Sequence, residues 1–141
     1  MKKMKKVMNT AMLYFILAMV GGVFYREFTK FNDFTATTTL GVIHTHLLAL
    51  GVAVFLLVAI LFKVTNLAEN KLYRRFYVLY NIGLPLMVIM MTIRGIFQVL
   101  GTNLSQGMNG MISGIAGLSH IAVAVALFML LLAVKKVLSE E

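Results

Sequence analysis

The chain has 141 residues, of which 60% are hydrophobic and only 13% are charged, and its mean hydropathy is +0.91. A soluble domain carries about a quarter charged residues, so this composition excludes an ordinary water-soluble fold. The formal charge of +8 does not indicate a nucleic-acid partner, because basic residues in a membrane protein more often set its topology. Cysteine is absent, which excludes disulfides, thiolate metal sites and covalent heme attachment.

Four apolar runs predict four transmembrane helices, at about residues 7–24, 40–62, 76–100 and 111–134. Each run is long enough, at about 1.5 Å per residue, to cross a hydrocarbon core of about 30 Å. The first run follows a basic leader and lacks a small-residue cleavage site, so we expect a retained helix and not a signal peptide. The expected fold class is therefore an all-α integral membrane four-helix bundle with a single domain.

The distribution of basic residues predicts the orientation of this bundle. On one side of the four runs, the only basic residues in the loops are Arg26 and Lys30. Because cytoplasmic loops are enriched in Lys and Arg, we expect both termini to be cytoplasmic in a multi-pass protein of the lipid bilayer. The basic residues on the expected cytoplasmic side are Lys2, Lys3, Lys5, Lys6, Lys63, Lys71, Arg74, Arg75, Lys135 and Lys136.

Four ionisable side chains are expected inside the membrane, and they fall in one layer. His44 and His46 lie about 8 to 11 Å below the outer surface, Arg94 about 9 Å and His120 about 13 Å, counted at the helical rise. Ionisable groups are expensive in a bilayer and normally face a partner, a cavity or a cofactor. This shared layer indicates a functional site.

Two histidines on different helices are the usual arrangement for holding a heme by both axial positions. We expect His120 to supply one ligand to a heme b iron. The other is His44 or His46, since positions two apart lie about 200° apart on a helix and cannot face the same way. The expected surroundings of the heme are Arg94, Gln98, Arg26 and Lys30 as partners of its propionates, and Tyr25 as a proton donor or an interface anchor.

The run Ile-His-Thr-His-Leu-Leu at 43–48 resembles the second-helix Leu-His-Thr-Asn-Leu-Leu pattern of nitric oxide reductases, which belong to the heme-copper oxidase superfamily. In that pattern the first histidine ligates the low-spin heme b, which implies this role for His44. His46 stands where the pattern has asparagine. Three histidines cannot hold a low-spin heme, a high-spin heme and a histidine-ligated metal, so the resemblance implies part of such a subunit and leaves open whether the chain is an enzyme.

Over its whole length the chain resembles an uncharacterised family of small four-helix membrane proteins from Gram-positive bacteria. The resemblance includes Gly-Val-Phe-Tyr-Arg-Glu-Phe at 22–28, Ile-Arg-Gly-Ile-Phe-Gln-Val-Leu-Gly at 93–101 and Ser-Gly-Ile-Ala-Gly at 113–117. It implies the bacterial cell membrane as location. The oxidase subunit contains three pseudo-symmetric groups of four helices, so the resemblance also raises a homotrimer of this chain as a hypothesis.

The leading hypothesis is a heme b-binding membrane protein in electron transfer with a redox partner, in heme or diatomic gas sensing, or in reaction with a diatomic molecule. The alternative is a protein without heme whose histidines bind or transport a divalent metal such as zinc or copper, or relay protons. In a third interpretation the three histidines and Arg94 have only a structural role and form hydrogen bonds with groups inside the bundle.

Overall fold

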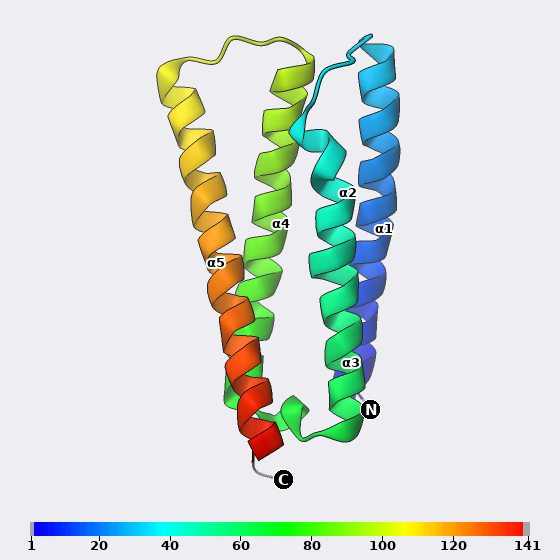
Figure 1. The fold of residues 1–141 in the computed structure, drawn as a ribbon, viewed down its shortest axis with the longest axis vertical. Helices are drawn as coiled ribbons and strands as arrows, with labels where there is room; N and C mark the ends of the chain where they lie inside the picture. Colours follow the sequence, from blue (N-terminus) through cyan, green and yellow to red (C-terminus); the bar gives the residue numbers. More distant parts are fainter. Residues whose placement is uncertain (1, 140–141) are drawn as a thin grey trace.

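The computed structural model describes residues 2–139, which form four long helices and no strand (Figure 1). The first is α1, Lys2–Phe31, and the last two are α4, Lys71–Val99, and α5, Gln106–Ser139. All four helices are long and apolar enough to cross a membrane. The expected all-α fold with four apolar helices is thus confirmed, and each expected run lies within a helix to within one residue.

The second long helix, Thr39–Val64, is a succession of different helix types. It begins with the 3₁₀-helix η1, Thr39–Val42, and the short α2, Ile43–His46. The π-helix η2, Leu47–Ala53, follows, and α3, Val54–Val64, completes the span. The 3₁₀-helix η3, Leu67–Glu69, then leads into α4.

Local side chains define where two of these helices start. The Thr38 hydroxyl accepts a hydrogen bond from the Leu40 amide at the start of η1. The Asn70 side chain likewise caps α4 by accepting from the amides of Leu72 and Tyr73, at 2.8 and 3.4 Å. Such caps satisfy the first backbone amides of a helix, which have no partner within it.

The helices alternate in direction, so Lys2 and Ser139 lie at the same end of the bundle (Figure 1). We call this the basic end, because the four helix termini there carry Lys2 to Lys6, Lys63, Lys71 to Arg75 and Lys135 to Lys136. The opposite end is the neutral end, where Arg26 and Lys30 are balanced by Glu27 and Asp33. The side of a membrane that each end faces is taken up under Proposed function.

The bundle consists of two helical hairpins. Helix α1 packs against the span from η1 to α3, and α5 packs against α4. Apart from α4, the element that α5 contacts most is η3 at the basic end. Figure 1 accordingly shows α5 near α3 at the basic end and diverging from α2 toward the neutral end.

Aromatic rings join the two hairpins in the half nearer the basic end. Phe55 of α3 stacks on Tyr14 of α1 with ring centroids 5.8 Å apart, and it meets Tyr77 and Tyr80 of α4 edge-on at the same distance. Phe55 and Tyr80 are fully buried. Helix α5 contributes no ring to this cluster of described residues, and its Phe128 is 61% exposed.

Glycine permits two close approaches between helices. A Cβ at Gly51 of η2 would lie 2.5 Å from the Cβ of Tyr14, and one at Gly95 of α4 would lie 2.5 Å from the Cγ of Leu40. Real Cβ atoms essentially never approach so closely, so a side chain at either position would push the helices apart. The second approach fixes η1 against α4 at the neutral end.

Candidate functional site

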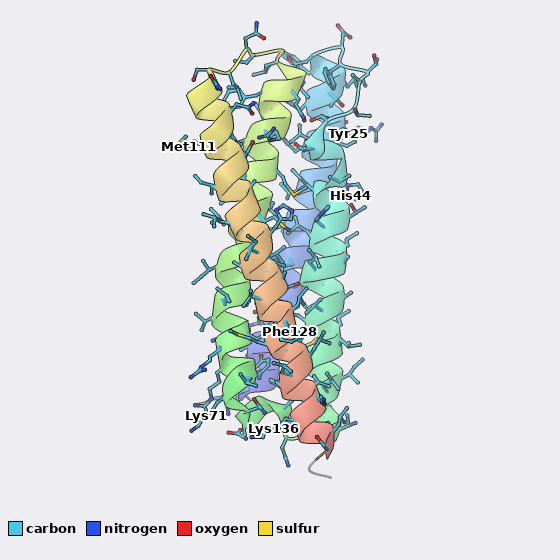
Figure 2. All side chains as sticks on the ribbon, turned by 60° about the vertical axis from the view of Figure 1, so that its left-hand side comes forward. Tyr25, His44, Lys71, Met111, Phe128 and Lys136 are labelled. Carbon is cyan, nitrogen blue, oxygen red and sulfur yellow. The ribbon has the colours of Figure 1, made fainter. Side chains whose placement is uncertain are left out.

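The histidines and Arg94 lie in the half of the bundle away from the basic end. Figure 2 shows His44 and Tyr25 in this half, with Lys71 and Lys136 at the opposite extremity. Met111, near the start of α5, marks the neutral end of the same view. The contacts below connect residues of all four long helices within this half.

His46 and His120 make the same local hydrogen bond. The Nδ1 atom of His46 lies 2.8 Å from the Val42 carbonyl oxygen, and Nδ1 of His120 lies 2.7 Å from that of Ala116. A carbonyl oxygen only accepts, so each Nδ1 must carry the proton and donate it. In the neutral imidazole this leaves the Nε2 lone pair as the acceptor or metal ligand, the tautomer that a backbone carbonyl typically fixes in metal-ligating histidines.

His44 has a different environment. It packs against α1, where a Cβ at Gly22 would lie 3.6 Å from the Cβ of His44. Its Nδ1 atom is buried and has no hydrogen-bond partner among the described residues. Because His46 is about 200° further around the helix, it is turned away from the face that meets Gly22. The two histidines of the pair are therefore placed in different surroundings.

Arg94 connects α4 to α5. Its Nη2 atom donates to the Ser113 hydroxyl at 2.6 Å and to the Asn109 side-chain oxygen at 3.4 Å. Arg94 is half-buried and lies seven residues, about two helical turns, after the buried Met87. Asn109 and Ser113 leave most of the five guanidinium N–H donors free for another acceptor.

His120 lies on the face of α5 that Arg94 contacts. Ser113 and His120 are seven residues apart, two helical turns and about 10 Å along the axis. Both are exposed, whereas the neighbouring face with Ile112 and Ser119 is buried against the bundle. Nothing lies within 4 Å of a Cβ built at Gly114 or Gly117 between them. This stretch of α5 is therefore open on the side that carries His120 and Ser113, the partner of Arg94.

Of the remaining predicted site residues, Gln98 and Tyr25 contact η1, whereas Arg26 and Lys30 are exposed. The Gln98 side-chain oxygen accepts from the Thr39 amide at 2.9 Å, and Tyr25 packs against Gly41, whose added Cβ would lie 3.3 Å from its ring. Arg26 is exposed and pairs with Glu27 at 3.6 Å. Lys30 is exposed beside Phe31. None of these four contacts Arg94 or a histidine through a hydrogen bond within residues 2–139.

Two features of the site do not follow from the reasoning on residue types. Asn109 was not singled out, although a polar side chain one turn before Ser113 on an apolar helix is a usable signal. The hydrogen bonds of the histidines to carbonyl groups depend on side-chain rotamers, which a sequence pattern does not specify. Within residues 2–139, no three of His, Asp and Glu gather as they would around a metal ion.

Comparison with known proteins identifies a family and no individual relative. The model of a family described as "Protein of unknown function (DUF2871)" matches residues 4–137. No curated protein and no solved structure matches the chain significantly.

Proposed function

The chain belongs to this DUF2871 family of unknown function, and we propose a function from its own residues. We propose that it is an integral membrane protein that binds heme b. Its two axial ligands are His120 of α5 and a histidine of α2, and its role is electron transfer. Four apolar helices of 26 to 34 residues support the membrane location. The basic end faces the cytoplasm by the positive-inside rule, which places the histidines in the outer leaflet half.

One observation carries the proposal: His46 and His120 both donate Nδ1–H to a carbonyl and keep Nε2 as a free lone pair. His120 is exposed and His46 is half-exposed, and ionisable side chains within apolar membrane helices are functional by default. A heme needs two such ligands, one from each helix. The residues present therefore fit this group in their donor chemistry.

We assign the ligand of α2 to His46. His44, the counterpart of the oxidase-pattern ligand, lacks an acceptor for Nδ1–H, so nothing in its surroundings fixes the tautomer with a free Nε2. Its side chain lies against α1 at Gly22. This assignment departs from the resemblance to nitric oxide reductases, and the two can be separated by mutation.

Arg94 is the group proposed to hold a heme propionate. Its guanidinium is always charged, is already fixed by Ser113 and Asn109, and retains free donors for a carboxylate. When bound, the heme supplies one-electron chemistry at its iron. His46 and His120 would both be engaged in holding the heme, which favours electron transfer over gas binding.

The test is the optical spectrum of the purified full chain and of three variants. The wild-type protein is expected to show a Soret band and a b-type α band on reduction, with stoichiometric iron. His46→Ala and His120→Ala should lose this spectrum, whereas His44→Ala should keep it.

Other outcomes of this test are equally decisive. Loss of the spectrum in His44→Ala with retention in His46→Ala would support the oxidase-pattern ligand against our assignment. Zinc or copper in place of iron, with no Soret band, would contradict the heme proposal and support the alternative of a histidine metal site.

A further inference from the structure

A groove of about 810 Å³ opens at the basic end between the first turn of α1, the last turn of α3 and η3. The turn of α1 that borders it also presents backbone amides without partners in the helix, which carry partial positive charge. The groove is lined by Lys2, Lys3, Met4, Lys5, Phe62, Lys63, Ala68 and Glu69.

The rim of the groove is strongly cationic. Four lysines and one glutamate give it a net charge of +3 at neutral pH. Lys3 is occupied, because its Nζ lies 2.6 Å from Glu69 Oε1 and 3.2 Å from the Ala68 carbonyl oxygen. Lys2, Lys5 and Lys63 form no ion pair within residues 2–139, so their charges are uncompensated by the protein that the structure describes.

Glu69 stays ionised beside this rim. The hydrogen bond from the Lys3 ammonium, together with its charge, holds the pKa of the Glu69 carboxyl below its usual range. The Arg74 guanidinium, 3.9 Å from Glu69 Oε2, acts in the same direction. Glu69 therefore neutralises Lys3 and connects the first turn of α1 to η3 at one side of the groove.

The floor of the groove is apolar. Met4 and Phe62 are half-buried and pack against the core, and the Phe62 ring meets Tyr73 edge-on with centroids 4.9 Å apart. A cationic rim above an apolar floor, at the end of four apolar helices, matches a molecule with an anionic head and an apolar body. A soluble anion would use the rim alone.

We propose that this groove binds the headgroup of an anionic phospholipid, with the phosphate at Lys2, Lys5 and Lys63 and the first acyl carbons against Met4 and Phe62. Basic pockets between membrane helices bind anionic headgroups in this way. The proposal depends on the membrane location and on no part of the heme assignment.

The test uses the full chain in mild detergent, titrated with phosphatidylglycerol and observed by native mass spectrometry. The variant Lys5→Gln/Lys63→Gln removes two charges from the groove. The matched control Lys71→Gln/Arg75→Gln removes two charges from the same end, outside the groove. The groove variant should bind the first phosphatidylglycerol at least about tenfold more weakly, while the control binds it as wild type does.

Several results would overturn the proposal. Equal losses in both double variants would mean that bulk charge attracts the lipid, and no loss in either would mean that the groove is not used. Equal binding of zwitterionic phosphatidylcholine, or displacement of phosphatidylglycerol by millimolar inorganic phosphate, would contradict an anionic lipid site. Unchanged unfolding temperatures of the variants would show that any loss is not misfolding.

Discussion

At the scale of residues, His46 and His120 share one hydrogen-bond pattern, and His44 differs from both because its Nδ1 has no partner among the described residues. The sequence places all three in one layer but does not distinguish His44 from His46, because spacing says only that they face apart. The distinction comes from carbonyl oxygens one turn earlier, at Val42 and Ala116. Arg94 was likewise predictable as an ionisable group in a span, whereas its bond to Ser113 required the packing of α5 on α4.

Arg94→Gln tests the charge beside the proposed heme. Removing a positive charge disfavours the reduced iron, so the midpoint potential should fall by roughly 30–60 mV, where about 59 mV corresponds to a tenfold change in the equilibrium. A redox titration followed at the α band measures it. Ser113→Ala, which removes the partner and keeps the charge, should shift the potential far less. Equal shifts in the two variants would contradict an electrostatic role for Arg94.

At the scale of elements, the apolar runs suffice to predict four helices, and what they miss is the change of helix type inside the second one. The π-helix η2 begins directly after His46 and runs through Leu47–Ala53. A π-turn disturbs the regular backbone pairing of a helix, and such segments occur often at functional sites. The Tyr80 hydroxyl, from the other hairpin, donates to the Leu50 carbonyl at 2.9 Å. This contact between distant segments has no local sequence signal.

Tyr80→Phe should therefore destabilise η2 specifically. The change removes the side-chain donor to the Leu50 carbonyl in a partly buried place, and losing such a bond costs about 1 kcal/mol. Hydrogen exchange of the amides of residues 47–53 should increase along with a lower unfolding temperature. Tyr77→Phe, which removes the bond between Tyr77 and Thr10, is the matched control and should leave exchange in η2 unchanged. Faster exchange in both variants would contradict a local role for Tyr80.

Two glycines in comparable helices should respond oppositely to alanine. Gly51→Ala places a Cβ 2.5 Å from that of Tyr14 and should lower the free energy of unfolding by about 1–3 kcal/mol. Gly117→Ala meets nothing within 4 Å and should be neutral or stabilising by up to about 1 kcal/mol, since alanine is the better helix former. Thermal unfolding in detergent compares them. A destabilised Gly117→Ala protein would mean that this face of α5 is covered by something else.

At the scale of the whole molecule, the unequal charge of the two ends predicts how it sits in a bilayer. Loop charges were enough for this inference, and the fold adds that Lys2 and Ser139 share one end. The packing of one hairpin against the other could not be predicted from the sequence. All four helices are apolar, and no residue pattern indicates which helices lie side by side. Phe55 shows this: only the structure reveals that it meets rings from both α1 and α4.

The topology can be tested with introduced cysteines, since the chain has none of its own. In intact cells, a membrane-impermeant maleimide should label Thr102→Cys in the loop after α4. It should label Lys71→Cys, at the start of α4, only after the membrane is opened. The reverse pattern would place the basic end outside and contradict the positive-inside assignment.

The two halves of α5 are packed unequally against the rest of the bundle. Toward the basic end Ala126, Leu130 and Ala133 are buried, whereas the face of α5 that carries Gly114 and Gly117 has no neighbour within 4 Å of an added Cβ. In the half toward the neutral end, α5 is tied to α4 by the bond from Arg94 to Ser113, and α5 contributes no ring to the cluster around Phe55 within the described residues. A change in the distance between this half of α5 and α2 would therefore leave that ring cluster in place. Open space beside the helix and close packing of the helix thus lie in opposite halves of α5.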